Sequence, residues 1–233
     1  MTSANLFPSP AWPTVPVKGE TAAYPIHRIF CVGRNYAAHA AEMGVEVDRE
    51  APFYFTKSAL TAEQSGAVVA YPPGTSNFHY EMELVIAIGA PVFKADVAAA
   101  QKAIYGYACG LDMTRRDLQL EARAKQRPWD LGKDVEQSAV FAPITRVADF
   151  AAIGPQRIHL AVNGEIKQEA HLSDLIWKVE EIVSHLSHYY HLQPGDLIMT
   201  GTPAGVGAVV AGDIITGGIG GLDPIELTIG AAE

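Results

Sequence analysis

Residues 80–88 read Tyr-Glu-Met-Glu-Leu-Val-Ile-Ala-Ile, a stretch in which two carboxylates precede an uninterrupted apolar run. In a β-strand, side chains two positions apart point to the same face, so Glu81 and Glu83 are expected side by side. Beyond them both faces are apolar, the pattern of a strand that is buried on both sides. Two adjacent carboxylates that enter a core are costly unless a cation neutralises them. The stretch therefore predicts a buried strand with a cation site at its beginning.

A third carboxylate, Asp112, ends an apolar, glycine-containing strand predicted over 104–113. Three oxygen ligands without His or Cys suit Mg²⁺ or Mn²⁺, which keep several waters and leave positions for a substrate. The alternative is that Glu81 and Glu83 are solvated on an edge strand, because Glu-x-Glu alone is common in such strands. The apolar run that follows favours the metal site.

The composition limits the class of protein. The chain has 233 residues, of which 48% are hydrophobic and 18% charged, so it can bury a sizeable core. A formal net charge of -9 argues against nucleic-acid binding, which requires a basic surface. Cys31 and Cys109 are far apart and form no Cys-x-x-Cys, which predicts two reduced thiols in a cytosolic protein. The N-terminus has no signal-like start and the longest apolar run, 84–93, is too short for a bilayer, so we expect a cytoplasmic protein without membrane contact.

The predicted elements form an α+β fold that is mainly β, with a few flanking helices. A proline-rich N-terminal arm over 1–24 precedes one domain over 25–233. Strands are predicted at 28–32, 53–57, 68–70, 81–88, 104–113, 158–162, 165–169, 195–200, 214–215 and 225–229, with a hairpin turn at Asn163-Gly164. Helices are predicted at 36–43, 96–102, 114–124 and, with Ser173 as N-cap, 174–190; residues 125–137 are predicted as a polar loop.

His39 and Glu42 lie three positions apart on the predicted helix 36–43, hence on one face. The polar loop over 45–51 that follows suggests that this helix is part of a mobile lid. The carboxylate could orient the imidazole as a general base. An ordinary surface His–Glu pair is the alternative, and the residues alone leave both open.

Three further segments carry polar groups. The glycine-rich loop 201–207 lacks the Lys of a P-loop and the context of a dinucleotide site, so it either wraps a small ligand or forms tight turns. Gly33-Arg34-Asn35 at a strand-to-helix junction is a weak anion-binding signal. On helix 114–124, one face is shared by Arg116, Gln119 and Arg123.

A metal site made of His185, His188 and His191 is rejected, because no acidic or cysteine partner accompanies them.

Taken together, these motifs resemble the fumarylacetoacetate hydrolase family, and within it the short bacterial fumarylpyruvate hydrolases and acylpyruvases. The resemblance runs from about residue 28 to 229, nearly the whole chain. The matching motifs are Gly33-Arg34-Asn35-Tyr36 with His39 and Glu42, Glu81-Met82-Glu83-Leu84, Gly110-Leu111-Asp112-Met113-Thr114 with Arg116, Asp117 and Gln119, Pro128-Trp129 with Lys133, and Gly201-Thr202-Pro203 with Gly205-Val206-Gly207. One departure is Ser58, which stands where relatives often carry Pro.

The resemblance implies a mixed β-roll of the fumarylacetoacetate hydrolase C-terminal-domain type, a homodimer, and a bound Mg²⁺ or Mn²⁺. It implies that the metal ligands are Glu81, Glu83 and Asp112. It implies that the catalytic groups are His39, Glu42 and Lys133, with the His–Glu pair as a lid dyad that activates water. It implies substrate-binding roles for Arg34, Lys57, Arg116, Gln119 and Thr202.

The implied activity is that of a hydrolase of carbon–carbon bonds, with 3-fumarylpyruvate and water giving fumarate and pyruvate in gentisate-type aromatic degradation. The residue types suit this chemistry, because a metal stabilises the departing enolate and a His–Glu pair can activate water. Arg34 would bind the far carboxylate of the fumaryl group. A decarboxylase of oxaloacetate or a tautomerase of a 2-oxo diacid is the alternative at the same site. A silent 2-oxo acid binding protein and a structural subunit are disfavoured, since the dyad and the acidic triad are complete.

Overall fold

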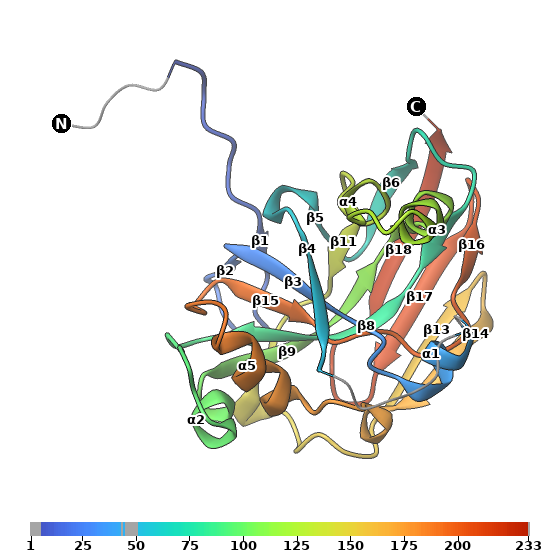
Figure 1. Ribbon diagram of the computed structural model, residues 1–233. Coiled ribbons are helices and arrows are strands. Elements are labelled where there is room, and N and C mark those ends of the chain that lie inside the picture. Colours follow the sequence, from blue (N-terminus) through green and yellow to red (C-terminus); the bar gives the residue numbers. More distant parts are fainter. Residues whose placement is uncertain (1–5, 43, 45–50, 233) are drawn as a thin grey trace.

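The computed structural model describes residues 6–42, 44 and 51–232 (Figure 1). Met43, the predicted lid loop over 45–50 and the chain ends 1–5 and 233 lie outside the described residues. Within the described ranges, no helix is both long enough and apolar enough to cross a membrane.

A large mixed sheet forms the centre of the molecule (Figure 1). Its strands are, in spatial order, β4 (Phe53–Lys57), β3 (Arg28–Gly33), β15 (Asp196–Met199), β8 (Met82–Ile88), β9 (Ile104–Asp112), β11 (Ala139–Phe141) and β5 (Ala62–Gln64), and β12 (Thr145–Arg146) also pairs with β9. The pairs β3–β15 and β11–β5 are parallel and the others antiparallel. The sheet is curled, because Lys57 at the end of β4 reaches Ser138 beside β11, with four strands between them in the order.

A second sheet packs against the large one. Its order is β14 (Glu165–His171), β13 (Arg157–Val162), β17 (Ile214–Ile219), β18 (Ile225–Ala232) and β6 (Ala67–Tyr71). A smaller sheet contains β10 (Thr114–Arg115), β7 (Phe78–Tyr80) and β16 (Gly207–Val209). The predicted Asn163-Gly164 turn joins β13 to β14, with both residues at positive φ. Strands dominate, so the predicted mainly-β α+β fold is confirmed.

The strand β8 separates two apolar cores. Every residue from Met82 to Ile88 is buried. Leu84, Ile86 and Ile88 belong to the larger core, which the second sheet helps to form, whereas Val85 and Ala87 belong to the smaller core on the other face. This alternation is the one predicted from the sequence. Glu83 shares the parity of Val85, so the carboxylate side of β8 continues the face of the smaller core.

The helices lie at the periphery of the sheets (Figure 1). They are α1 (Ala37–Glu42), α2 (Val97–Lys102), α3 (Arg116–Ala124), α4 (Asp130–Lys133) and α5 (Val179–Ser187), with 3₁₀ turns at Ala59–Thr61, Val147–Asp149 and Leu172–Asp174. The predicted helices 36–43 and 96–102 are confirmed within their described residues.

Three predicted element bounds are wrong. The helix predicted over 174–190 begins only at Val179, because the backbone of Ile176 and Trp177 donates to the carbonyl and side chain of Asn35. Ser173 is therefore not its N-cap. The helix predicted from Thr114 begins at Arg116, since β10 pairs with β7. The loop predicted over 125–137 contains the short helix α4.

The chain packs onto the domain well before residue 25. The strands β1 (Thr14–Val15) and β2 (Tyr24–Pro25) pair, and Val15 and Val17 are buried in the smaller core. Residues 6–13 lead away from the body of the molecule without regular structure (Figure 1). The boundary between arm and domain at residue 24 stays a prediction.

Candidate active site

One cavity gathers most of the predicted site residues. It opens between the beginning of β8, the helices α3 and α4, and the loop after β15. Its lining residues are Val32, Gly33, Arg34, His39, Phe53, Phe55, Glu81, Glu83, Arg116, Gln119, Arg123, Trp129, Lys133 and Thr202. Of the predicted residues, Glu42 and Asp112 contact this lining from behind, through His39 and Lys133 respectively. Lys57 stands apart from the cavity.

The three predicted metal ligands come together through the register of β8 and β9. Met82 pairs with Leu111, and the Asp112 amide donates to the Glu81 carbonyl at 2.9 Å, which places Asp112 beside the first glutamate. One carboxylate oxygen from each of the three residues lies within 4.8 Å of the others. All three side chains are buried. The structure thus supports the cluster that was predicted from Glu-x-Glu and the strand-end Asp.

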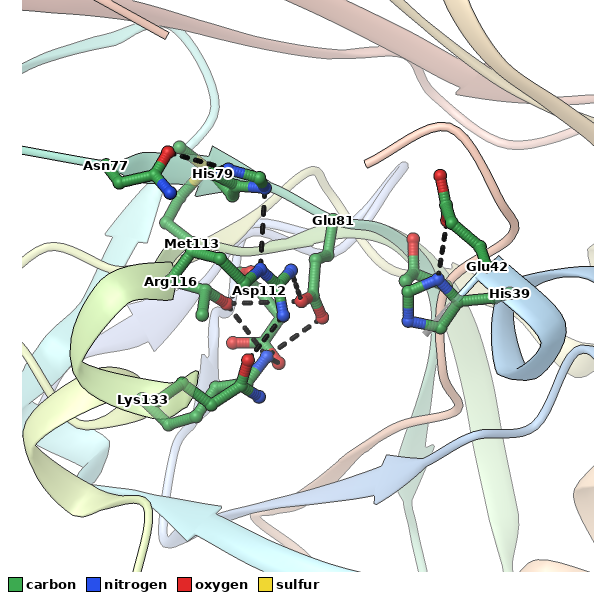
Figure 2. Close-up of polar contacts among 12 residues, drawn as sticks. His39, Glu42, Asn77, His79, Glu81, Asp112, Met113, Arg116 and Lys133 are labelled. Atoms are coloured by element: carbon green, nitrogen blue, oxygen red, sulfur yellow. Dashed lines mark hydrogen bonds and ion pairs between the residues drawn. The ribbon is translucent and has the colours of Figure 1, made fainter. Parts of the chain in front are cut away.

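Lys133, the last residue of α4, supplies the cation that lies among these acids (Figure 2). Its Nζ donates to Glu81 Oε2 at 2.8 Å, to Asp112 Oδ2 at 2.7 Å and to Thr114 Oγ1 at 2.8 Å. Burial by itself raises the pKa of Glu81, but the charges of Lys133 and Arg116 outweigh burial and leave that pKa below its ordinary value. Burial by itself lowers the pKa of Lys133, but Asp112 and Glu81 leave it above its ordinary value. Glu81 and Lys133 are therefore ionised together.

The donor set fits a hard divalent cation. Burial, with the neighbouring charges of Asp112 and Glu81, raises the pKa of Glu83 well above its ordinary value, so this carboxylate lacks sufficient compensation from the protein. Asp112 Oδ1 is buried and has no hydrogen-bond partner among the described residues; the Lys57 Nζ lies 3.0 Å away as an ion pair without hydrogen-bond geometry. Carboxylate oxygens are the ligands that Mg²⁺ and Mn²⁺ prefer. Glu81, Glu83 and Asp112 would hold such an ion.

Arg116 connects the acidic cluster to polar side chains on α3 and β7 (Figure 2). Its guanidinium donates to Glu81 and, one helical turn along α3, to the Gln119 side chain. Its Nε donates to His79 Nδ1 at 3.4 Å, and His79 Nε2 lies 2.9 Å from the Asn77 side-chain oxygen. Nδ1 of His79 accepts from Arg116, which only donates, and Nε2 faces the Asn77 oxygen, which only accepts. His79 is therefore neutral, with its proton on Nε2.

His79 was missed by the sequence reasoning. It lies two positions before Glu81, so the period of a strand places the two side chains on one face. That spacing was the available signal. Burial, and next the charge of Arg116, lower the pKa of His79 to about 4, in agreement with a neutral ring.

His39 and Glu42 form a hydrogen-bonded pair on α1 (Figure 2). The His39 Nδ1 lies 3.1 Å from Glu42 Oε2, and because a carboxylate only accepts, Nδ1 carries the proton. The other ring nitrogen keeps its lone pair for a proton from water. Glu42 is in turn held by the Gly205 amide, which donates to its two oxygens at 3.1 and 3.2 Å. The pair is thus more than a solvated contact on a helix surface.

The glycine-rich loop uses its amides within the protein. The Gly201 amide donates to Glu83 Oε2 at 2.6 Å, and the Gly205 amide donates to Glu42. Both glycines have positive φ, and a Cβ on Gly205 would lie 2.0 Å from the Lys167 carbonyl oxygen. These two amides therefore orient a predicted metal ligand and the predicted dyad instead of facing a ligand themselves.

Lys57 does not reach the cavity, although the resemblance implied that it binds substrate. Its side chain is fully buried behind Asp112. Its Nζ donates to the Met113 carbonyl at 3.0 Å, to Ser138 Oγ at 2.8 Å and to the Lys133 carbonyl. An ammonium group with its protons directed to these acceptors supports Asp112 and α4 from the far side.

Arg34 lies on an aromatic wall of the cavity. Its guanidinium carbon is 5.3 Å from the centroid of the Phe53 ring, and its backbone has a positive φ of 59°. The Phe53 ring lies edge-on to Trp129 with centroids 5.2 Å apart. A Cβ on Gly33 would lie 2.0 Å from the Phe53 ring, so glycine is required for this close approach.

Comparison with known proteins agrees with the fold of this chain. The sequence profile of the fumarylacetoacetate (FAA) hydrolase C-terminal family matches residues 28–230. A fumarylpyruvate hydrolase of Ralstonia sp is 58% identical over 193 residues, which are 82% of this chain and 100% of that protein. The mitochondrial oxaloacetate tautomerase FAHD1 of Homo sapiens is 40% identical over 197 residues, 83% of this chain and 87% of that protein. A crystal structure of fumarylpyruvate hydrolase from Pseudomonas aeruginosa in complex with Mn²⁺ and pyruvate matches with a TM-score of 0.93 and 42% identity, covering 98% of this chain and 100% of that one.

Proposed function

This chain belongs to the fumarylacetoacetate hydrolase family, and from that premise we propose that it hydrolyses a carbon–carbon bond of an acylpyruvate. The proposed reaction is 3-fumarylpyruvate plus water giving fumarate and pyruvate. The observation that carries the proposal is the buried Glu81–Glu83–Asp112 cluster, whose two glutamates line one cavity together with His39 of the His39–Glu42 pair. The 58% identity to a fumarylpyruvate hydrolase supports the choice of substrate.

His39 is the proposed general base. Its unprotonated ring nitrogen takes a proton from water as the water oxygen adds to the acyl carbonyl, while Glu42 holds the imidazole and stabilises its positive charge. The bond between the acyl carbon and the pyruvate methylene then breaks, and its electron pair leaves with pyruvate as an enolate. The proton on His39 returns to that carbon, so the products are fumarate and pyruvate and the base is regenerated.

The acidic cluster and its cations bind the 2-oxo acid end. A Mg²⁺ or Mn²⁺ ion bound there would polarise the 2-oxo acid and stabilise the negative charge that develops on it. Lys133 adds a fixed positive charge at the same point, and Arg116 and Gln119 offer donors from α3. Thr202 lines the cavity from the other side. Arg34, at the aromatic wall, would pair with the far carboxylate of a fumaryl group.

A substrate panel tests the proposal. Fumarylpyruvate, acetylpyruvate and oxaloacetate are assayed side by side with Mg²⁺, with Mn²⁺ and with EDTA. We expect fumarylpyruvate to have the highest kcat/KM, and EDTA to abolish turnover. Full activity in EDTA would contradict the metal site, and turnover of oxaloacetate alone would contradict the hydrolase assignment.

Tautomerisation of oxaloacetate is the second candidate, because oxaloacetate tautomerases of Homo sapiens and Escherichia coli are 40% and 35% identical to this chain. Moving a proton within a 2-oxo diacid needs a base and stabilisation of an enolate, but no attacking water. The loss of the enol absorbance of oxaloacetate, followed with and without the enzyme, measures that activity separately from hydrolysis.

Four finer assignments belong to the proposal. We assign Mg²⁺ as the metal in the cell with Mn²⁺ as a substitute, a homodimer, a cytoplasmic location, and a place in gentisate-type aromatic degradation. Mn²⁺ and pyruvate are bound in the fumarylpyruvate hydrolase from Pseudomonas aeruginosa, which supports a divalent ion and a 2-oxo acid. Sedimentation measures the oligomer, and metal analysis of protein purified without added metal identifies the ion.

A further inference from the structure

Gln168 on β14 joins the second sheet to the cavity, although it does not line the cavity itself. It is fully buried. Its Oε1 accepts from the Met82 amide at 2.9 Å, between the two predicted metal-binding glutamates. Its Nε2 donates to Thr202 Oγ1 and to the Pro203 carbonyl, each at 2.8 Å. One side chain thus contacts both the metal-binding strand and the loop after β15.

The partners fix the orientation of the Gln168 amide. The Met82 amide only donates, so the group that faces it is the oxygen of Gln168. The Pro203 carbonyl only accepts, so the group that faces it is the NH₂. The two protons of that NH₂ are then directed to Pro203 and Thr202, and the Thr202 hydroxyl must be an acceptor in its bond with Gln168.

The consequence concerns the hydroxyl proton of Thr202. Because Thr202 Oγ1 accepts from Gln168, its own O–H has to donate elsewhere. Among the residues that the structure describes, none accepts a hydrogen bond from the Thr202 hydroxyl. Thr202 lines the cavity together with Glu81 and Glu83. The proton is therefore available to an acceptor in the cavity.

We propose that Gln168 is a positioning residue that makes Thr202 a fixed hydrogen-bond donor to an anionic oxygen of the ligand. The ligand class is a 2-oxo acid or its enolate, so the inference rests on the proposed function and adds a residue to it. Gln168 acts through Thr202 and touches no reacting atom. The same amide holds the loop whose Gly201 and Gly205 contact Glu83 and Glu42.

A double-mutant cycle with oxalate as the ligand tests the proposal. Oxalate is titrated calorimetrically into protein with saturating Mn²⁺, for wild type, Gln168→Met, Thr202→Val and the double variant. Loss of one hydrogen bond to a charged oxygen is expected to weaken oxalate binding about tenfold in each single variant. The double variant should also lose about tenfold rather than a hundredfold, because the two residues act in series.

Two controls separate positioning from a general structural role. Mn²⁺ affinity is expected to stay close to that of wild type, because Met82 is not a ligand. Ser187→Ala removes a fully buried hydroxyl that bonds the Ala95 amide and the Ser184 carbonyl away from the cavity, so it should lower stability without changing oxalate affinity. A hundredfold loss in the double variant, an unchanged affinity in Gln168→Met, or collapse of Mn²⁺ binding in that variant would overturn the proposal.

A second variant covers the case in which Gln168→Met does not fold. Gln168→Glu keeps an acceptor for the Met82 amide and removes at least one donor proton, so it should also weaken oxalate binding. Wild-type affinity in that variant would overturn the proposal. If wild type binds oxalate and the cycle behaves as described, but no acylpyruvate is hydrolysed, the proposed function fails while the role of Gln168 stands.

Discussion

The ion cluster around Glu81 and the His39–Glu42 pair contact the same cavity but are held in different ways (Figure 2). Glu81 between β7 and β8, Asp112 on β9 and Lys133 on α4 are buried, and each contacts a neighbouring opposite charge. His39 and Glu42 lie on the short helix α1, and the Glu42 side chain is 35% exposed. The acidic cluster is thus fixed by the core. The proposed base His39 depends instead on the placement of the peripheral helix α1 and of the loop after β15, whose Gly205 amide holds Glu42.

The largest expected effect comes from removing one acid of the cluster. Glu83→Gln keeps the size of the side chain and removes its charge, so the divalent ion loses a ligand. We expect kcat/KM to fall roughly 10⁴-fold, which corresponds to a rise of several kcal/mol in the activation barrier. Circular dichroism should show that the variant keeps its fold. Glu226→Gln, at an exposed position of β18, is the matched control and should be active. Near-normal turnover of the Glu83 variant in saturating Mn²⁺ would remove this residue from the site.

The second effect separates the dyad from the cluster. His39→Asn removes the proposed base, so kcat should fall about 10³-fold while Mn²⁺ and oxalate affinities stay close to those of wild type. Single-turnover kinetics and calorimetry measure the two quantities. His188→Asn, at an exposed position after α5, is the control. If the His39 variant lost oxalate affinity as strongly as rate, the dyad would act in binding with the acidic cluster and the comparison would fail.

The third effect concerns stability. Lys133→Met leaves Glu81 and Asp112 without their shared cation, so the metal-free protein should lose about 3 kcal/mol of unfolding free energy. Urea unfolding with EDTA and with Mn²⁺ measures this loss. Part of the stability should return with Mn²⁺, because a divalent ion neutralises the same carboxylates. A variant as stable as wild type in EDTA would show that the Lys133 ion pairs do not hold the cluster together.

The smallest expected effect is a dependence of stability on pH that arises from the contact between His185 on α5 and Tyr54 on β4. His185 Nδ1 lies 3.0 Å from the Tyr54 hydroxyl, and burial, with the charge of His188, lowers the pKa of His185 below its ordinary value of 6.5. The unfolded chain then binds more protons just below pH 6.5, so stability should fall as the pH drops through that value. Urea midpoints at pH 7.5 and 5.5 should differ more for wild type than for His185→Gln. An equal difference in both proteins would contradict the assignment.

The sequence predicted the centre of this molecule better than its edges. The strand predicted over 81–88 is observed as β8 at Met82–Ile88. Its two apolar faces and the meeting of Glu81, Glu83 and Asp112 follow from strand period and from the cost of buried charge. The family predicted from the motifs is confirmed. Strand pairing decided what the local pattern could not, as at Thr114, which joins β10 instead of starting a helix.

Residues distant in sequence explain the other differences. The segment before α5 reads as helical, but its backbone is bound by Asn35, more than a hundred residues earlier. Lys57 carried a motif-based substrate role, and only the curl of the sheet places it behind Asp112. Gln168 had no local signal, because its importance comes from contacts with Met82 and Thr202 on two other segments.

The alternation along β8 also limits how this protein can vary. Val85 and Ala87 pack in one core, and Leu84 and Ile86 pack in the other, while Glu83 extends the first of these faces into the cavity. A one-residue slip of a strand moves every side chain to the opposite face. A single insertion or deletion within β8 would therefore exchange the contents of both cores and turn Glu83 away from Asp112. Substitutions can change the ligand-binding residues one at a time. The length of this strand cannot change, because both the packing of the cores and the position of Glu83 depend on it.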